Sequence, residues 1–298
     1  MTDGDKSTST GPAAPDQSST WRIIDLINWG RDYFHKRNID NARLEVEWLL
    51  AQVLKLKRVD LYVQFERPLD GEELARFKQM VLRRVSGEPL QYILGTAPFC
   101  EHDFLVTPAV LIPRPESEII IERLRAGSAP ESILDIGTGS GCIGITAALL
   151  YPQARVTVLD ISPEALVVAR ENATQLEALN VTFAELDILQ ATPEGSFDVL
   201  TCNPPYISAT EWDVIDDQVK ANEPAIALLD MGDGLTFFRR LAEIGAGLLN
   251  PGGRLIVEIG GRGQSGPVEA LFTATGATCS FYPDLQDDLR VGVVRWGE

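Results

Sequence analysis

The chain has 298 residues, 45% of them hydrophobic, which is enough for one large domain and a smaller one with buried cores. It has no run of roughly 20 uncharged apolar residues, no CxxC pair among its four cysteines and only two histidines, so the sequence predicts neither a membrane-spanning helix nor a metal site. The net charge is −17. Residues 20–95 carry 13 basic and 11 acidic residues, whereas the rest of the chain carries 13 basic and 32 acidic residues and accounts for the negative charge. So acidic a surface disfavours direct binding of nucleic acid.

The first segment, residues 1–20, is polar and lacks the apolar stretch of a signal peptide, so we expect a disordered tail and a cytoplasmic protein. Residues 21–95 are predicted to form a small helical domain. Leu74, Phe77 and Val81 recur there at helical spacing, and Gly87 follows as a C-terminal cap. Because this domain holds half of the basic residues, it is the candidate surface for docking a protein substrate.

A hairpin and a proline-rich linker are predicted at 96–118, and a different pattern occupies 119–298. Segments typical of strands lie at 133–136, 155–159, 181–186, 197–202, 254–259, 278–282 and 291–295, and helical segments lie at 142–150, 163–175 and 235–249. Such alternation predicts an α/β fold with a doubly wound, mostly parallel, seven-stranded sheet. Residues 207–233 show no clear element, and loops of that length commonly act as lids or binding loops.

A glycine-rich turn follows the first of these strands and precedes a helix. Gly137, Gly139 and Gly141 alternate there with Thr138 and Ser140, so the backbone can approach a ligand closely. The spacing differs from the G-x-G-x-x-G of dinucleotide folds, which seats a pyrophosphate on a helix N-terminus. It suits the amino-acid part of S-adenosylmethionine, which has no phosphate.

Two carboxylates end the next two strands. Asp160 is expected to accept hydrogen bonds from both ribose hydroxyls, and Asp187 with Ile188 is expected to meet the adenine amino group and ring face. Either carboxylate alone is more commonly a helix cap or a turn residue. However, the glycine turn, Asp160 and Asp187 follow three successive strands, and the carboxyl ends of the strands form the edge at which open α/β sheets bind ligands. The sequence therefore predicts S-adenosylmethionine as the cofactor.

The sequence Asn203-Pro204-Pro205-Tyr206 follows an apolar run that the prolines prevent from continuing as a strand. The Asn203 side-chain oxygen and the Pro204 carbonyl can accept the two N–H groups of a planar amide or aromatic amine, while Pro205 and Tyr206 offer surfaces for packing. We expect Asn203 to border the cofactor as well, and the pattern predicts methyl transfer to a planar nitrogen. Cys202 could be a nucleophile, but a small core residue is its commoner role.

Together these motifs resemble those of the HemK/PrmC family, the S-adenosylmethionine-dependent N5-glutamine methyltransferases of peptide chain release factors. The resemblance covers residues 40–296. Further segments that carry it are SGEPLQYILG at 86–95, TPAVLIPRPE at 107–116, Glu223-Pro224, DGL at 233–235, Gly252-Gly253 and EIG at 258–260. One departure is Ala97-Pro98-Phe99-Cys100, where the family pattern has a glycine after the aromatic residue, and it leaves the hairpin geometry open.

The resemblance implies a Rossmann-like class I methyltransferase with an N-terminal helical domain that docks the release factor. It implies transfer of a methyl group to the glutamine of the release factor GGQ loop, with S-adenosylhomocysteine as the other product and no metal. We expect a monomer that contacts neither membrane nor nucleic acid.

Two other functions are compatible with parts of the pattern. An adenine-N6 nucleic-acid methyltransferase would bind the same two N–H groups, but enzymes that flip a base need a basic groove, and the part outside 20–95 is strongly acidic. A non-catalytic cofactor-binding adapter is the second alternative. The intact Asn203 and glycine turn argue against it.

Overall fold

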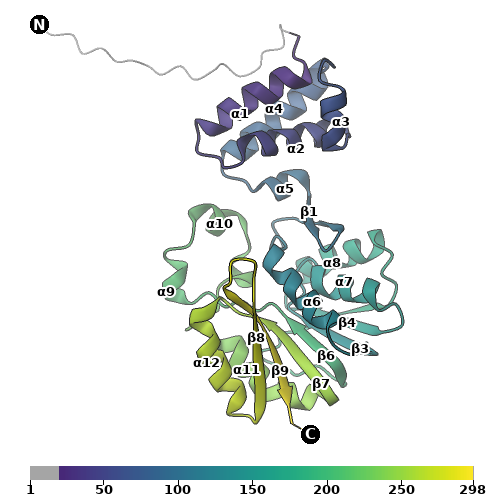
Figure 1. Ribbon diagram of the computed structural model, residues 1–298, viewed down its shortest axis with the longest axis vertical. Helices are drawn as coiled ribbons and strands as arrows, with labels where there is room; N and C mark the ends of the chain where they lie inside the picture. Colours follow the sequence, from purple (N-terminus) through teal and green to yellow (C-terminus); the bar gives the residue numbers. More distant parts are fainter. Residues whose placement is uncertain (1–19, 298) are drawn as a thin grey trace, which may run out of the picture. The chain divides into compact units, whose positions relative to one another are not determined.

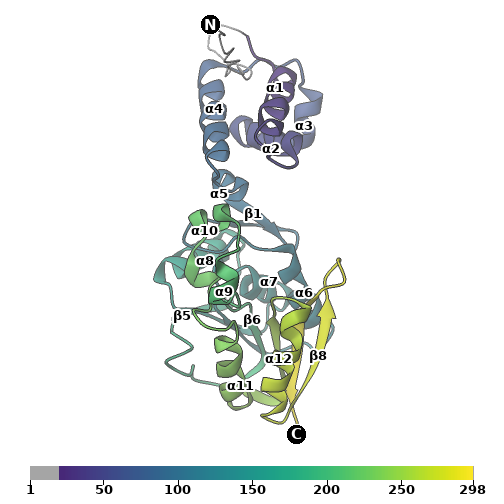
Figure 2. The same cartoon turned by 90° about the vertical axis from the view of Figure 1, so that its left-hand side faces the viewer.

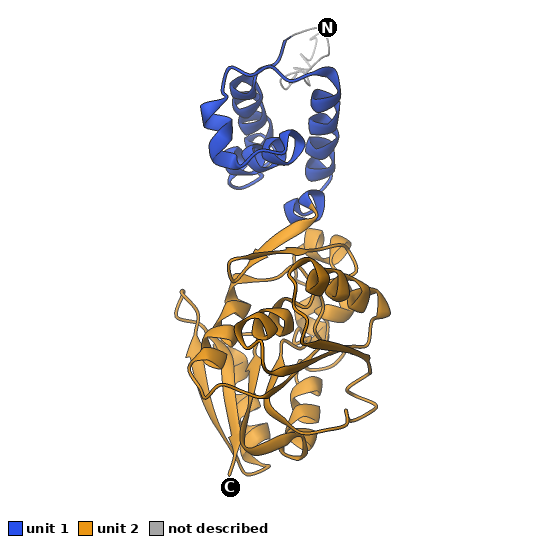
Figure 3. Cartoon of the chain, turned by 90° about the vertical axis from the view of Figure 1, so that its right-hand side faces the viewer, with its two compact units in different colours: residues 1–94 blue, residues 95–298 orange. Residues whose placement is uncertain are grey.

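The computed structural model describes residues 20–297, and the chain divides into two compact units between Leu94 and Gly95 (Figure 3). The tail expected at 1–20 lies outside the described residues, apart from Thr20. Within 20–297, no helix combines the length and the apolar character needed to cross a bilayer.

The N-terminal unit is a set of helices whose apolar faces share one core. They are α1 (Ile23–His35), α2 (Ala42–Leu54), α3 (Arg58–Val63), α4 (Gly71–Val85) and α5 (Leu90–Leu94) (Figure 1). Helix α4 begins at a capping box, in which Asp70 accepts the N–H of Glu73 and Glu73 accepts the N–H of Asp70. Gly30 lets α1 and α2 pack closely, because a Cβ at this position would lie 2.7 Å from Val46. The fully buried side chains of this core include Phe34, Leu50 and Phe77.

The C-terminal unit is built on a seven-stranded sheet. Its strands are β3 (Ser132–Ile136), β4 (Arg155–Asp160), β5 (Val181–Glu185), β6 (Phe197–Cys202), β7 (Leu249–Glu258), β8 (Ala277–Pro283) and β9 (Leu289–Trp296). Their order is β5-β4-β3-β6-β7-β9-β8, and only β9 runs against its neighbours. This confirms the predicted mostly parallel sheet. Strand β7 starts earlier than expected because Leu249 pairs with Phe197 ahead of a register shift.

Helices cover both faces of this sheet, as a doubly wound fold requires. On one face lie α6 (Glu118–Arg125), α7 (Cys142–Leu150) and α8 (Pro163–Gln175), and on the other lie α11 (Thr236–Leu248) and α12 (Arg262–Thr273) (Figure 1). Ile121 and Ile145 are buried in the first core, and Phe238 and Phe272 in the second. From β3 the chain proceeds outward to β4 and β5 and then returns to β6. The strand order therefore reverses between β3 and β6.

The hairpin predicted within residues 96–118 is present as β1 (Thr96–Phe99) and β2 (His102–Leu105). Cys100 and Glu101 at its turn have positive φ angles of 46° and 69°, a conformation that glycine or asparagine adopts more readily. Phe99 and Phe104, both buried in the first core, anchor the two strands. The missing glycine therefore leaves a strained turn but does not prevent the hairpin.

The segment 207–233 is not without structure, so that part of the prediction is wrong. It contains α9 (Ala209–Trp212), α10 (Asp217–Asn222) and the 3-10 turn η2 (Ala225–Ala227), and Figure 2 shows both helices on the excursion from β6 to α11. Ser208 and Asp216 cap the two helices with their side chains. Each element is at most six residues long, which is too short to produce a helical period in the sequence.

Candidate active site

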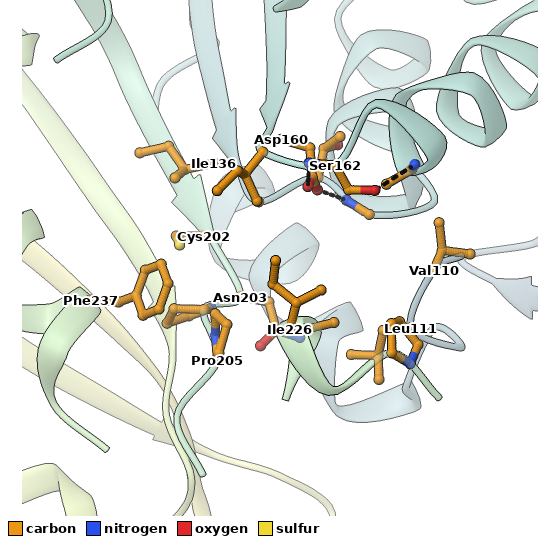
Figure 4. Close-up of a pocket in the computed structure, with 18 of the residues that line it drawn as sticks. Val110, Leu111, Ile136, Asp160, Ser162, Cys202, Asn203, Pro205, Ile226 and Phe237 are labelled. Atoms are coloured by element: carbon orange, nitrogen blue, oxygen red, sulfur yellow. Dashed lines mark hydrogen bonds between the residues drawn. The ribbon is translucent and has the colours of Figure 1, made fainter. Parts of the chain in front are cut away.

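A cavity of about 320 Å³ lies at the carboxyl ends of β3, β4 and β6, where the strand order reverses. Open α/β sheets bind ligands at this switch point, and the volume suits a small molecule. The predicted site residues that line it are Gly137, Thr138, Gly139, Ser140, Asp160, Asp187, Ile188, Asn203, Pro204 and Pro205. Figure 4 shows Asp160 and Ser162 across the cavity from Asn203, Pro205 and Phe237. Gly141 and Tyr206 were also predicted, but they are not part of the lining.

The glycine turn gives the cavity one open wall. Gly137 and Gly139 have φ angles of 68° and 55°, and a Cβ on either would meet no atom within 4 Å, so the space above them is free for a ligand. The N–H groups of Gly137 and Thr138 donate to the Leu159 carbonyl, which ties the turn to β4. Gly141 has a different role, because a Cβ there would lie 2.5 Å from Ile145 of α7.

Asp160 holds the glycine turn against the end of β4. Its carboxylate accepts the N–H of Gly139 at 2.8 Å and the N–H of Ser162 at 2.9 Å. Burial raises the pKa of this carboxyl. Asp187 accepts the N–H of Leu189 at 2.9 Å in a similar local turn. Both residues thus have the local role of a cap or turn residue and also face the cavity.

Asn203 belongs to a hydrogen-bonded chain of side chains that the sequence did not reveal. Its Nδ2 donates to Ser117 Oγ at 3.1 Å, and Ser117 Oγ donates to Glu258 Oε2 at 2.5 Å. Tyr206, which lies behind the cavity lining, donates its hydroxyl to Glu258 Oε1 at 3.3 Å. Among residues 20–297, no group donates a hydrogen bond to Asn203 Oδ1, and this oxygen is therefore available to a ligand.

Glu258 is fully enclosed by the unit at the end of β7. Burial raises the pKa of its carboxyl to about 7, although the hydrogen bonds from Ser117 and Tyr206 and the charge of Arg290 oppose this shift. Burial likewise raises the pKa of Tyr206, so its phenol stays protonated and remains a donor. Glu258 was recognised in the sequence only as part of an EIG segment. Its partners are 52 and 141 residues away, so no local pattern indicates them.

A second buried carboxylate, Asp135, lies beneath the glycine turn. It accepts hydrogen bonds from Thr138 at 2.6 Å, Thr201 at 2.7 Å and the N–H of Gly144 at 3.1 Å. These bonds join β3 to the turn, to β6 and to α7. Burial raises the pKa of Asp135 to about 6. The residue thus supports the cavity from behind.

The linker and the segment after β6 meet on another side of the cavity. Arg114 forms an ion pair with the buried Glu223 at 2.5 Å, and Glu223 also accepts the N–H of Ile112 at 3.3 Å. Leu111 and Ile226, which flank this junction, line the cavity (Figure 4). The linker and the segment that follows β6, for which no regular structure is predicted, are therefore joined by an ion pair and a hydrogen bond and form a wall of the site.

The charges of the lining fit S-adenosylmethionine better than a dinucleotide. Asp160, Asp187 and Asp230 are acidic, and Arg114, the single basic residue of the described lining, is already paired with Glu223. A sulfonium cation is favoured in such surroundings, whereas a pyrophosphate would meet uncompensated carboxylates. The open glycine turn and the carboxylate beside it supply the contacts that an amino-acid group and a ribose require.

The thiol alternative finds little support in this cavity. Burial raises the pKa of the Cys202 thiol well above its usual range, which removes the thiolate that a nucleophile needs. Within the described chain, no group of three or more His, Cys, Asp or Glu side chains is arranged to hold a metal ion.

Comparison with known proteins gives two matching family models, the PrmC N-terminal domain over residues 25–95 and the methyltransferase small domain over residues 115–227. The release factor glutamine methyltransferase of Geobacter sulfurreducens is 44% identical over 257 residues, which cover 86% of this chain and 90% of the relative. The protein of the same name from Chlorobaculum tepidum is 41% identical and covers 82% and 87%.

Solved structures show the same fold at lower identity. A methyltransferase from Pyrococcus furiosus matches with a TM-score of 0.50 and 20% identity over 64% of this chain and 87% of its own. The hMettl16 catalytic domain, solved in complex with MAT2A 3'UTR hairpin 1, matches with a TM-score of 0.52 and 15% identity over 78% and 83%. At these identities the similarity concerns the fold.

Proposed function

We propose that this chain, which belongs to the family of release factor glutamine methyltransferases, transfers a methyl group from S-adenosylmethionine to the side-chain nitrogen (N5) of the GGQ glutamine in a release factor. One observation carries the proposal. Asn203, whose amide oxygen accepts no hydrogen bond from residues 20–297, lines the same cavity as an open glycine turn. The name shared by the relatives supplies the class of substrate.

The cofactor would be held by residues at three strand ends. The backbone of Gly137 and Gly139 would receive the amino-acid part, Asp160 the ribose hydroxyls, and Asp187 with Ile188 the adenine. When bound, S-adenosylmethionine supplies an electrophilic methyl group on a positively charged sulfur. The acidic lining of the cavity favours binding of that cation.

The substrate amide is a weak nucleophile because its nitrogen lone pair is delocalised into the carbonyl. The contribution of the protein is therefore mainly orientation, which can supply several kcal/mol of the barrier. Asn203 Oδ1 and the Pro204 carbonyl would each accept one N–H of the amide, and Pro205 would limit the position of its plane. An asparagine amide is too weak a base to remove a proton, so its role is to polarise and hold the N–H groups.

The helical unit would dock the release factor, since it contains half of the basic residues of an otherwise acidic chain. Charge complementarity of this kind favours an acidic protein surface. A substrate that functions on the ribosome would place the enzyme in the cytoplasm, and the proposed oligomeric state is a monomer. The acidic composition of the C-terminal unit is unfavourable for the alternative, adenine-N6 methylation of nucleic acid.

The decisive test is mass spectrometry of a release factor incubated with this protein and S-adenosylmethionine. We expect a gain of one methyl group on the peptide that contains the GGQ glutamine. A DNA or RNA substrate should remain unmodified under the same conditions. Methylation of adenine in place of glutamine would reject the proposal.

A further inference from the structure

A buried relay of side chains adjoins Asn203, with Ser117 itself part of the cavity lining, and it concerns the orientation of the Asn203 amide. An amide presents an oxygen at one edge and an NH₂ group at the other, and the two edges have nearly the same shape. Only the oxygen edge can accept an N–H from a substrate amide. The reverse orientation would set donor against donor. Asn203 therefore needs a partner that distinguishes its two edges.

Ser117 makes this distinction because its hydroxyl has a single proton. Ser117 Oγ lies 2.5 Å from Glu258 Oε2, the separation of a hydroxyl that donates to an ionised carboxylate, which is the form of Glu258 above its pKa of about 7. The serine proton is therefore directed at Glu258, and Ser117 Oγ can only accept a hydrogen bond from Asn203. Its neighbour at 3.1 Å must then be Asn203 Nδ2, which turns Oδ1 the other way.

Glu258 in turn is fixed by its surroundings. Its second oxygen accepts the Tyr206 hydroxyl at 3.3 Å, so both carboxylate oxygens act as acceptors. The charged and titratable groups whose fields reach it are Glu116 beside Ser117, Arg290 on β9, Tyr206 after β6, and the thiols of Cys202 and Cys142. Of these only Arg290 is positive, and Arg290 is also paired with Asp284 and Asp288.

We propose that Ser117 and Glu258 are positioning residues that fix the Asn203 amide with its oxygen toward the substrate. The inference rests on the proposed function, since it assigns Asn203 the task of accepting a substrate N–H. The ionised carboxylate is the essential element of the relay. A neutral group at position 258 could donate to Ser117 Oγ, and the serine proton would then be free to turn to Asn203 Oδ1.

The test compares Ser117→Ala, Ser117→Thr and Glu258→Gln with the wild-type protein on intact release factor. Ser132→Ala and Asp198→Asn are matched controls, because Ser132 Oγ also donates to a carboxylate, Asp198, at 3.1 Å, and neither residue lines the cavity. For Ser117→Ala and Glu258→Gln we expect kcat to fall about 10- to 100-fold, because each variant loses one oriented hydrogen bond in the transition state. Binding of S-adenosylhomocysteine should stay within about threefold in all variants.

Two further readouts separate positioning from simple loss of structure. Ser117→Thr retains the hydroxyl and should recover most of kcat. The double variant Ser117→Ala/Glu258→Gln should be no slower than the slower single variant, since both act through the same amide. The inference is overturned if kcat falls no more than in Ser132→Ala and Asp198→Asn, or if the two losses multiply. Failure of the wild-type protein to methylate release factor would instead reject the proposed function.

Discussion

Asp160→Ala is expected to weaken the binding of S-adenosylmethionine by about 100-fold, an effect that can be derived from the unused acceptor positions of the carboxylate. Asp160 accepts the N–H of Gly139 at 2.8 Å and that of Ser162 at 2.9 Å. A carboxylate has about four lone-pair positions, so one on each oxygen remains. Two neighbouring ribose hydroxyls can occupy these positions.

The magnitude follows from the charge and the burial of Asp160. A hydrogen bond to a charged group contributes about 1.5–3 kcal/mol, so two such bonds would contribute about 3–6 kcal/mol if they were additive. Two bonds to the same carboxylate are not fully additive, which favours the lower end of this range. A loss of about 3 kcal/mol corresponds to roughly a 100-fold increase in Kd.

Isothermal titration calorimetry with S-adenosylhomocysteine would measure this loss. Glu185→Ala is the matched control, because Glu185 ends the neighbouring strand β5 but does not line the cavity. Asp160→Ala also removes a partner of Gly139, so a second ligand is needed to separate direct contact from a loosened turn. The 2′,3′-dideoxy form of S-adenosylhomocysteine lacks both hydroxyls and should bind the wild-type and Asp160→Ala proteins with similar Kd values.

The reasoning would be refuted by an Asp160→Ala protein whose Kd for S-adenosylhomocysteine lies within threefold of the wild-type value. It would equally be refuted if the variant weakened the dideoxy ligand as much as the natural one. In that case Asp160 would act through the glycine turn alone.

Three other expectations follow from the same site. Asn203→Ala should abolish methyl transfer while Kd for the cofactor stays within about tenfold, and near wild-type turnover would contradict the role of Asn203. The pKa of Glu258 is about 7 in the folded protein against an ordinary 4.5. Protonation of Glu258 therefore stabilises the folded state fully below pH 4.5, and this stabilisation is lost as the pH rises through 7. The free energy of unfolding of Glu258→Gln, measured in urea, should therefore rise relative to that of the wild-type protein between pH 5 and pH 8, by up to about 3 kcal/mol. A difference between the two proteins that stays the same over this pH range would contradict this pKa. A protein that begins at Gly95 retains the whole cavity lining and should bind the cofactor. Its kcat/KM on intact release factor should fall to a small fraction of the full-length value, whereas its kcat/KM on a GGQ peptide should change little. Equal kcat/KM for the shortened and full-length proteins on intact release factor would exclude docking by the helical unit, provided that circular dichroism shows a folded protein.

Much of the fold is encoded in short-range patterns. The strands of the sheet are apolar runs between turn residues, and the glycine turn is a local sequence, so both could be predicted from the chain alone. The turn and Asp160 are 21 residues apart but belong to one βαβ unit, in which the next strand end must lie beside the first. Asn203 could be placed at the same edge by the same reasoning.

The supporting residues could not be predicted because their partners are distant in sequence. Ser117 reaches Glu258 across 141 residues, and Arg114 reaches Glu223 across 109. Neither pair has a spacing that distinguishes it from ordinary surface residues. Gly141 and Tyr206 are motif residues whose surroundings could not be predicted either. They belong to the motifs, but one is required for close helix packing and the other lies behind the cavity.

The two buried carboxylates of this site, Asp135 and Glu258, differ in what their charge achieves. Burial raises the pKa of both, so each ionised form costs the folded protein stability at neutral pH. Asp135 uses its charge to join β3 to the glycine turn, β6 and α7, and a neutral amide there would turn an NH₂ group toward one of three donors. Glu258 joins only two hydroxyl groups, which can rotate to suit a neutral partner. Its charge is therefore dispensable for folding, and its effect is confined to the direction in which the Ser117 proton points.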